Sequence, residues 1–464
     1  MFGTSGVRGT LDELGPELAL RLAKAFSELL EEGSVVAVGR DVRPHARVIE
    51  SAVVSGLLSS GIDVEECGVV PTPALLYYVR REGLGGAVAI TGSHTPPEII
   101  GVLFFSGDTS ELGPREQELV EEAFRRGEYR RVPWSRVGKL AEVERGELLE
   151  AYSSGVEELA DVKRISSLGA RVVLDLGGGA QCGYLPEVAE ALGCSAEVLG
   201  GVPDGTFSRR PPCPTPEVLG ELSSRVREAR ADLGLAVDGD GDRALFSDES
   251  GGILWGDVAG ALLAKYELLR KGGGAVVCPV NTSRLVEWVC EKYGGVVVYT
   301  RIGPPSIADG IKKSERVAFA FEETGKYIWP EGILYGDPAL ALAKVLEVVD
   351  AEGALSRAVA EFPEFYRIKT GVECPDELKE ECLSLVEEEC ESAFPGAAID
   401  TTDGVKVVLA SGDWLLLRPS GTEPVFRCYA ESSSEALCRE LAERGLEILE
   451  RALSRIRERR SEAI

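Results

Sequence analysis

The sequence predicts an α/β protein made of three similar α/β units, followed by a smaller α+β unit. Short apolar runs typical of buried strands alternate with stretches of helical periodicity, and the alternation starts again twice along the chain. The last hundred or so residues depart from it, since they contain several strand-like runs in succession and two helical stretches. A chain of 464 residues is also too long for a single hydrophobic core. We therefore divide the chain into residues 1–149, 150–252, 253–362 and 363–464.

The first unit opens with a glycine-rich stretch, residues 2–9, that fits neither a helix nor a regular strand. Apolar residues at helical spacing then predict a helix over residues 16–31. The next strand, 34–39, ends in a loop that carries Arg40 and Arg43. Further elements predicted in this unit are a helix ending near residue 60 and strands at 63–70, 86–90 and 102–105.

The later units repeat or replace this pattern. In the second unit a helix near 147–159 precedes strands at 171–176 and 231–237, which end in three glycines and in a run of aspartates respectively. The third unit is predicted to contain a helix at 257–269 and strands at 274–278, 295–299 and 316–321. The last unit is predicted to contain strands at 365–372, 404–410, 413–418 and 425–430, and helices at 376–390 and 435–455.

The amino-acid composition argues against several classes of protein function. The net charge of −27 argues against a nucleic-acid or anionic-membrane partner. No apolar run approaches 18 residues and no signal-peptide pattern opens the chain, so we expect a cytoplasmic protein. Eleven cysteines without a CxxC pair indicate buried thiols and not a zinc site. Asparagine, glutamine and methionine are nearly absent, which is typical of hyperthermophile proteins, in which some cysteines can be paired.

The loop at residues 91–98 joins the strand at 86–90 to the apolar run at 102–105. It places Ser93 at its tip, beside His94 and two prolines, in a position suited to phosphoryl chemistry. By itself the loop is more often an ordinary turn. Four other stretches of the chain favour the phosphoryl-transfer interpretation over an ordinary turn.

The strongest of these stretches is Asp238-Gly-Asp240-Gly-Asp242-Arg243, which directly follows the strand at 231–237. Three carboxylates separated by glycines can turn inward around one hard cation and leave positions open for a phosphate oxygen. An EF-hand is the nearest alternative, but Arg243 holds the position that needs glycine, and the preceding element is a strand. We therefore favour a Mg²⁺ site over an EF-hand or a plain acidic turn.

Two further loops follow strands. Arg418-Pro-Ser420-Gly421-Thr422 combines a guanidinium, two hydroxyls and free N–H groups, the parts of a phosphate-binding loop, although a polar hairpin loop is the alternative. The other loop comprises Glu322, Glu323, Thr324, Gly325 and Lys326, and its carboxylate and hydroxyl can bind vicinal sugar hydroxyls while Lys326 reaches a phosphate. This second signal is weak by itself. Arg8 and the pair Arg40/Arg43 add positive charge on loops of the first unit.

Taken in order, five loops resemble those of the α-D-phosphohexomutase family. They are residues 3–9, residues 91–94, Asp238 to Arg243, residues 322–325 and Arg418 to Pro424. The resemblance covers nearly the whole chain. It implies a heart-shaped, four-domain phosphohexomutase-like architecture, with three similar α/β domains and a C-terminal α+β domain around a central cleft.

The resemblance also implies a role for each loop. Ser93 resembles the family's phosphoserine, and a phosphoserine oxygen would complete the Mg²⁺ shell of Asp238, Asp240 and Asp242. Arg8 and Arg243 would steady the reacting phosphoryl group. The remaining positions implied to bind substrate are Glu322 and Thr324 with Gly325 for the sugar hydroxyls, and Arg418, Ser420, Gly421 and Thr422 for the phosphate that does not react.

The implied reaction interconverts hexose 1-phosphates and hexose 6-phosphates through phospho-Ser93 and a hexose 1,6-bisphosphate. We expect mannose and glucose phosphates as substrates and a monomer or homodimer. A phosphoglucosamine mutase and a sugar-phosphate-binding relative without turnover are the two alternatives. Intact Ser93, the three aspartates and the Arg418 loop argue against the second.

The sequence departs from the family pattern near the serine. Leu103 stands where the family carries a lysine close to the phosphoserine, and Lys326 stands where a histidine often follows the sugar loop. We hypothesise that Lys326 takes over part of the proton-transfer role, since a lysine in such a site can be tuned as a general base. His94 is the other candidate, although its position favours bracing of the serine loop.

Overall fold

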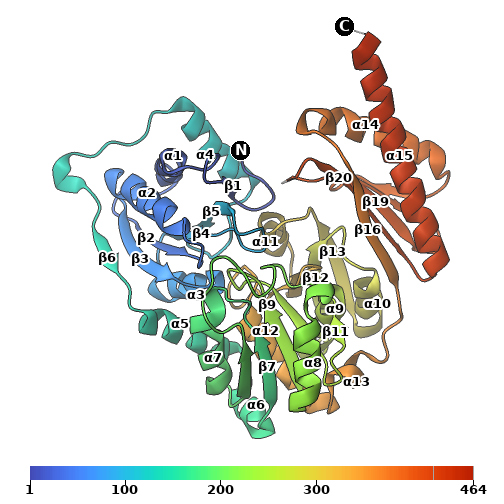
Figure 1. The fold of residues 1–464 in the computed structure, drawn as a ribbon, viewed down its shortest axis with the longest axis horizontal. Coiled ribbons are helices and arrows are strands. Elements are labelled where there is room, and N and C mark those ends of the chain that lie inside the picture. Colours follow the sequence, from blue (N-terminus) through green and yellow to red (C-terminus); the bar gives the residue numbers. More distant parts are fainter. Residues whose placement is uncertain (422, 463–464) are drawn as a thin grey trace.

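The computed structural model describes residues 1–421 and 423–462, which form four sheets in succession along the chain (Figure 1). We call the four parts built around these sheets units 1 to 4. Units 1 to 3 alternate strands and helices, and unit 4 has an antiparallel sheet with two long helices. The predicted fold class is thus confirmed.

Unit 1 has a six-stranded sheet in the order β1-β5-β4-β2-β3-β6. Its elements are β1 (Val7–Thr10), α1 (Pro16–Ser27), β2 (Val35–Arg40), α2 (Ala46–Ser59), β3 (Asp63–Val69), α3 (Thr72–Glu82), β4 (Gly86–Ile90), β5 (Ile99–Ser106), α4 (Pro114–Arg126) and β6 (Leu140–Glu142). The expectation of no regular strand in residues 2–9 is wrong, because Val7–Thr10 pairs antiparallel with β5. The edge of β5 supplies hydrogen bonds that outweigh the low strand propensity of glycine.

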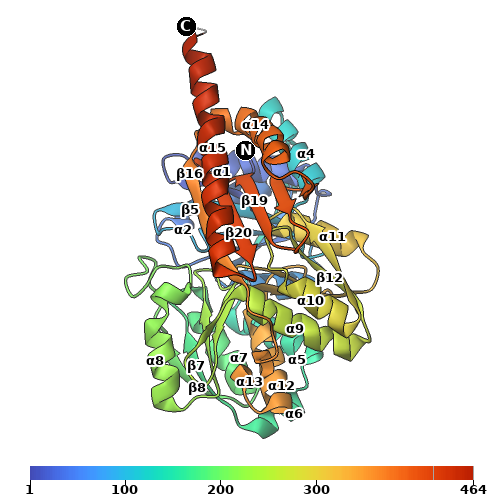
Figure 2. The same ribbon diagram turned by 90° about the vertical axis from the view of Figure 1, so that its right-hand side faces the viewer.

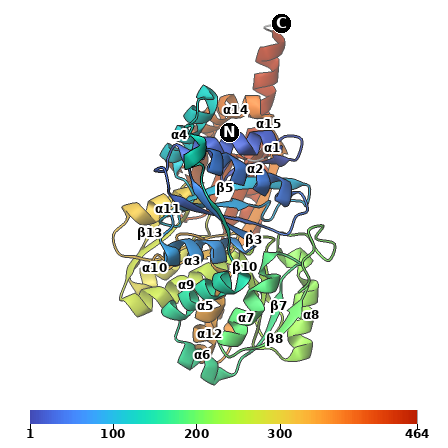
Figure 3. The ribbon, with the colours of Figure 1, turned by 90° about the vertical axis from the view of Figure 1, so that its left-hand side faces the viewer.

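Unit 2 has a five-stranded sheet in the order β11-β10-β9-β7-β8. Its elements are α5 (Arg145–Leu159), α6 (Val162–Leu168), β7 (Arg171–Asp175), α7 (Leu185–Ala191), β8 (Ser195–Leu199), α8 (Gly220–Ala229), β9 (Leu233–Val237), β10 (Ala244–Ser247) and β11 (Ile253–Leu254). Figure 3 shows the connection from α4 through β6 to α5 running along the outside of unit 1.

Unit 3 has a four-stranded sheet in the order β13-β12-β14-β15. Its elements are α9 (Gly256–Lys271), β12 (Gly274–Pro279), α10 (Leu285–Tyr293), β13 (Gly295–Thr300), α11 (Pro304–Lys313), β14 (Val317–Glu322), β15 (Lys326–Ile328), α12 (Pro338–Glu352) and α13 (Leu355–Val359). Helix α12 is buried along most of its length and packs against α5, α6 and α7, so it fixes unit 3 to unit 2.

Unit 4 has a five-stranded antiparallel sheet in the order β16-β20-β19-β18-β17. Its elements are β16 (Tyr366–Glu373), α14 (Lys379–Ala393), β17 (Ala398–Asp400), β18 (Val405–Val408), β19 (Trp414–Pro419), β20 (Val425–Ser432) and α15 (Glu435–Glu462). Figure 2 shows α15 lying across this sheet, with its C-terminal end projecting beyond the rest of the molecule.

The sheets of units 1 to 3 share one four-stranded core. In each, three neighbouring parallel strands are followed by an antiparallel one, in the orders β3-β2-β4-β5, β8-β7-β9-β10 and β13-β12-β14-β15. The connection from the third parallel strand to the antiparallel strand is therefore equivalent in the three units. These connections are the Ser93 loop, the aspartate loop and the Glu322 loop.

The hydrophobic cores show how the units are joined. One core continues through units 1, 2 and 3, whereas α1, α2 and α4 cover the other face of the unit 1 sheet with a core of their own. Unit 4 has a separate core, and a small cluster around Val280 and Trp414 connects it to unit 3. Units 1 to 3 thus form one packed body that carries unit 4 on unit 3.

Two further expectations concern the whole chain. All eleven cysteines are free thiols, and nine of them are buried. Among the described residues, no helix is both long and apolar enough to cross a membrane.

Candidate functional site

The three equivalent loops meet where units 1, 2 and 3 adjoin. The Ser93 Oγ donates a hydrogen bond to Asp238 Oδ2 at 2.8 Å, across the boundary between units 1 and 2. From unit 3, Lys326 Nζ lies 2.5 Å from Asp242 Oδ2. The tertiary structure thus brings together side chains from positions 93, 238–242 and 326.

Ser93 is held in an unusual conformation. Its side chain is buried and its φ is +49°, in the left-handed region that non-glycine residues rarely adopt. Arg43 binds the carbonyl oxygens of Ser93 and Thr95 at 3.2 and 2.6 Å, and Asp41 accepts hydrogen bonds from Thr91 Oγ1 and Gly92 N. The surrounding backbone is therefore fixed before any ligand binds.

Arg40 and Arg43 were predicted to add positive charge on loops of unit 1, but both guanidinium groups are paired with carboxylates. The Arg43 side chain is fully buried and paired with Asp41, while Arg40 is paired with Glu50. Their charges are neutralised locally, because buried guanidinium groups need carboxylate partners. Arg43 thus supports the serine loop, and Arg40 joins the end of β2 to α2.

The three aspartates suit a hard divalent cation. Asp238, Asp240 and Asp242 are each 1% exposed, and one oxygen of each lies within 4.8 Å of those of the other two. The Oδ1 atoms of Asp240 and Asp242 have no hydrogen-bond partner among the described residues, which is rare for buried oxygens. Oxygen-only ligands with unused lone pairs are what Mg²⁺ prefers, so the residues fit this ion.

Electrostatics supports the same conclusion. Burial, followed by the charge of Asp242, raises the pKa of Asp238 above its usual value. Burial and the two neighbouring carboxylates raise the pKa of Asp240 well above its usual value. Asp242 also loses solvation, but Lys326 and Arg243 outweigh this effect and lower its pKa. A divalent cation would relieve the repulsion that remains between the carboxylates.

Arg8 and Arg243 lie around the same point. Arg8 donates from Nε to Ser5 O at 3.2 Å and from Nη1 to Gly92 O at 3.3 Å, so it contacts the loop that carries Ser93. Arg243 Nε lies 3.9 Å from both Asp238 and Asp242. Burial opposes the charge of Arg243, but these aspartates and Glu322 raise its pKa, so it stays a cation.

His94 stays neutral in this setting. Burial lowers the pKa of His94 well below its usual value, and the cations Arg243, Arg8 and Lys326 lower it further. Its Nδ1 makes no hydrogen bond within the described part of the chain. The bracing of the serine loop comes from Arg43 and Asp41, which the sequence interpretation did not single out for that role.

The Glu322 loop is bound tightly to the exit of the aspartate loop. Glu322 is 5% exposed and accepts a hydrogen bond from Thr324 Oγ1 at 2.9 Å. Gly325 has a φ of +90° and its carbonyl accepts from Ala244 N at 2.9 Å, with no room for a Cβ beside Ala244 O. Glycine is therefore required where the two loops approach each other.

The Arg418 loop of unit 4 approaches unit 1. Arg418 Nε pairs with Asp403 at 3.2 Å, and Ser420 is buried. A Cβ on Gly421 would lie 3.1 Å from the side chain of Thr4, so this loop lies against the N-terminal loop of unit 1. The predicted residue Thr422 lies outside the described residues.

A buried carboxylate that the sequence interpretation missed supports the N-terminal loop. Glu111 accepts hydrogen bonds from Gly6 N at 2.7 Å and from Ser5 Oγ at 2.9 Å. Burial raises the pKa of Glu111 to about 7, even though Lys326, Ser5 and Arg8 act in the opposite direction. Sequence offered no signal for Glu111, since an isolated glutamate after a strand is commonplace.

We expect Glu111→Gln to change the pH dependence of stability. A carboxylate with an ordinary pKa of 4.5 that is raised to about 7 favours the folded protein below pH 4.5, and this contribution is lost as the pH rises through 7. Between pH 5 and pH 8 the wild-type protein should therefore lose about 3 kcal/mol relative to Glu111→Gln. Thermal midpoints of both proteins across this range measure the difference. A constant gap between the two curves, equal to that of the exposed control Glu128→Gln, would contradict the prediction.

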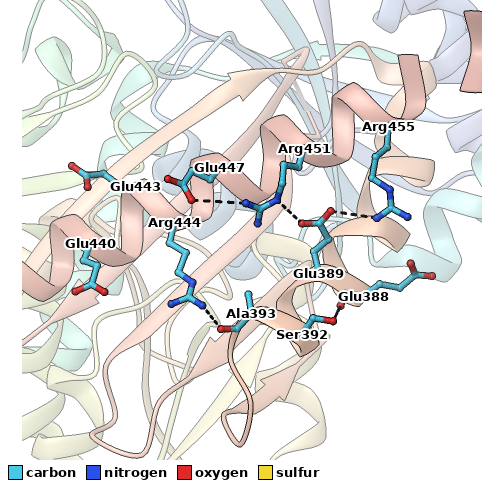
Figure 4. Close-up of a pocket in the computed structure, with 10 residues that line it drawn as sticks. All are labelled: Glu388, Glu389, Ser392, Ala393, Glu440, Glu443, Arg444, Glu447, Arg451 and Arg455. Carbon is cyan, nitrogen blue, oxygen red and sulfur yellow. Dashed lines mark hydrogen bonds and ion pairs between the residues drawn. The ribbon is translucent and has the colours of Figure 1, made fainter. Parts of the chain in front are cut away.

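One surface hollow lies away from these loops. A cavity of about 780 Å³ opens between α14 and α15 and is lined mainly by glutamates and arginines (Figure 4). Its arginines are already engaged, because Arg451 and Arg455 pair with Glu389 and Arg444 binds Ala393 O. This surface offers no free cationic site for a phosphate.

Comparisons with known proteins agree with the arrangement. The family models for phosphoglucomutase/phosphomannomutase α/β/α domains I, II and III match residues 1–131, 150–252 and 255–366, and the C-terminal domain model matches 372–448. A probable phosphoglucosamine mutase from Methanopyrus kandleri is 40% identical, with 98% of this chain and 99% of the relative covered. A phosphoglucomutase/phosphomannomutase from Thermococcus kodakarensis is 35% identical with the same coverage. The crystal structure of a phosphoglucomutase/phosphomannomutase family protein from Burkholderia thailandensis has a TM-score of 0.83 at 22% identity, covering 96% of this chain and 97% of that one.

Proposed function

The chain belongs to the phosphoglucomutase/phosphomannomutase family, and from this premise we propose that it interconverts hexose 1-phosphates and hexose 6-phosphates through a phosphoserine at position 93. The observation that carries the proposal is the 2.8 Å contact between Ser93 Oγ and Asp238 inside a buried cluster of three aspartates. Cations from three units surround this contact. A serine so placed is suited to hold a phosphoryl group and to transfer it.

In the proposed reaction the phosphoryl group leaves Ser93 Oγ as a free sugar hydroxyl oxygen forms the new P–O bond. The hydroxyl proton passes to a base, and a hexose 1,6-bisphosphate results. The bisphosphate then turns over in the site, so that its other phosphate is transferred to Ser93 Oγ and the second monophosphate leaves. Mg²⁺ bound to Asp238, Asp240 and Asp242 would supply charge stabilisation for the transferring phosphoryl group.

The protein's own residues divide the remaining tasks. Arg8 and Arg243 offset charge on the reacting phosphoryl group, because both lie beside the Ser93 and aspartate loops. Glu322, Thr324 and Gly325 orient the sugar through its hydroxyls. Arg418, Ser420, Gly421 and Thr422 bind the distal phosphate, whose position then alternates with that of the reacting one.

We assign part of the proton transfer to Lys326 and expect Lys326→Ala to lower kcat by about 10²–10³-fold. The alternative role is purely electrostatic, since Lys326 contacts Asp242 and the Tyr335 hydroxyl. Lys326→Arg separates the two, because arginine keeps the charge but cannot act as a base. Steady-state conversion of glucose 1-phosphate to glucose 6-phosphate is the measurement, with Lys271→Ala as the control. Near wild-type turnover in Lys326→Arg would show that only the charge matters.

We propose that glucose and mannose phosphates are the preferred substrates. We also propose that His94, next to Ser93, is a further neutral group beside the reacting centre. The name of the Methanopyrus kandleri relative favours a second candidate, a phosphoglucosamine mutase. Values of kcat/KM for glucose, mannose and glucosamine 1-phosphates, each with a trace of the matching bisphosphate, would rank the substrates. A kcat/KM for glucosamine 1-phosphate at least tenfold above those for the other two sugars would favour the second candidate instead.

The proposed phosphoenzyme is tested by intact mass before and after incubation with glucose 1,6-bisphosphate and Mg²⁺, followed by peptide mapping. We expect one added phosphate on Ser93, which is lost when hexose monophosphate is added. No phosphate, or phosphate at another residue, would refute the phosphoserine mechanism and favour a sugar-phosphate-binding protein without turnover.

A further inference from the structure

Each of the three equivalent loops is supported by an arginine that is paired with an aspartate. Arg43 pairs with Asp41 and binds Ser93 O, while Arg210 pairs with Asp175 and binds Val237 O at the start of the aspartate loop. In both cases the arginine belongs to the unit whose loop it supports. The third loop differs, because its arginine comes from another unit.

That arginine is Arg367, the second residue of β16 in unit 4. Its guanidinium pairs with Asp257 at the start of α9, donates to Asn281 O at 2.9 Å and lies 3.7 Å from Glu323 Oε2. These three partners all belong to unit 3. On its own side, Arg367 Nε lies 3.5 Å from Glu431.

Glu323 is the point where unit 4 meets the loop that we assign to sugar binding. It directly follows Glu322, is 7% exposed and accepts from Asn281 Nδ2 at 3.2 Å. Lys369 comes two residues after Arg367 and hence lies on the same face of β16. Its Nζ is 3.2 Å from Glu323 Oε1. Two cations of unit 4 therefore contact one carboxylate between Glu322 and Thr324.

The strand that carries these cations is joined rigidly to the proposed phosphate loop. Strand β16 pairs with β20 over its whole length, and β20 pairs with β19, which ends at the Arg418 loop. Buried Glu431 on β20 is held by Trp414 Nε1 at 3.0 Å and by Arg284 N at 2.8 Å. A shift of unit 4 against unit 3 would thus move the phosphate loop and strain the Glu323 contacts together.

We infer that Arg367 is a positioning residue that sets the distance between the sugar-binding loop and the phosphate-binding loop, acting through Glu323 and Asp257. The inference rests on the proposed function, because a sugar phosphate must contact both loops at once. This positioning role explains why position 367 carries an arginine. A forked guanidinium can bind partners from two units at once, which a lysine cannot do equally well.

The test compares Arg367→Gln with Arg284→Gln. Arg284 is a matched control, because it also joins units 3 and 4 and its side chain is also 24% exposed, but it contacts Ser411 O and Asp413 instead of the sugar loop. We expect Arg367→Gln to raise KM for the hexose 1-phosphate at least tenfold with less than a threefold change in kcat, and Arg367→Lys to recover part of the loss. Arg284→Gln should stay within twofold of wild type. Equal KM changes in the two Gln variants, or no change in Arg367→Gln, would overturn the inference.

Two further measurements keep the inference separate from the proposed function. Glu323→Gln should raise KM as well, and the increase in the double variant with Arg367→Gln should be smaller than the product of the two single increases, because the two residues share one contact. Backbone amides at residues 322–326 should exchange hydrogen faster in Arg367→Gln than in Arg284→Gln. If the wild type converts no sugar phosphate, the proposed function fails, and the exchange experiment still decides whether Arg367 orders this loop. Unchanged exchange in Arg367→Gln would refute the positioning role.

Discussion

Ser93→Ala is expected to lower kcat by about 10⁴-fold or more, because it removes the oxygen that carries the phosphoryl group. The fold should persist, since the support of this loop comes from Arg43 and Asp41, which bind its backbone and Thr91. In the alanine variant, the same contacts of Arg43 and Asp41 should hold the left-handed backbone conformation at position 93. Coupled assays of glucose 6-phosphate formation measure the loss.

The control for this variant is Ser27→Ala, which removes a buried hydroxyl of unit 1 far along the chain from the site. It should keep wild-type turnover. Ser93→Ala should also take up no phosphate from glucose 1,6-bisphosphate. Turnover of Ser93→Ala above about one tenth of the wild-type value would mean that another group carries the phosphoryl transfer.

Asp240→Asn is expected to have the second largest effect, with opposite consequences for activity and stability. Loss of one of three carboxylates should weaken Mg²⁺ binding and lower kcat by about 10³-fold at a fixed Mg²⁺ concentration. Without Mg²⁺ the variant should be at least as stable as the wild type, since burial and two neighbouring carboxylates raise the pKa of Asp240 well above its usual value. Removing that charge relieves a repulsion that the metal would otherwise balance.

Thermal midpoints with chelator and with Mg²⁺ test this prediction directly. Mg²⁺ at about 100 times its dissociation constant should stabilise the wild type by about 2.7 kcal/mol, and Asp240→Asn should lose most of this gain. Asp12→Asn, which removes an equal charge from an exposed position, should respond to Mg²⁺ like the wild type. An equal gain in Asp240→Asn would place the ion elsewhere.

Much of the fold was predictable from local sequence. Several strands of the three α/β units, such as β4, β9 and β14, are apolar runs that the sequence already marks as buried, and the structure buries them. The aspartate loop was predictable too, because carboxylates that alternate with glycines directly after a buried strand are typical of a loop that binds a hard cation. In contrast, β1 was missed, since its residues form a strand only when the edge of β5 is present to pair with them.

Local sequence was enough to identify the residue types that lie at the strand ends, namely Ser93, the aspartates, Glu322 and Lys326. It could not reveal that three of these loops occupy the same place in a repeated sheet, because strand order is set by pairing between distant segments. Nor could it separate the charges that face a ligand from those that support the backbone. Arg43 and Arg8 look alike in the sequence and both bind carbonyl oxygens of the serine loop, yet Arg43 is paired with Asp41, whereas Arg8 has no carboxylate partner among the described residues. Burial and the distance to a carboxylate make that difference, and both depend on contacts between residues far apart in the chain.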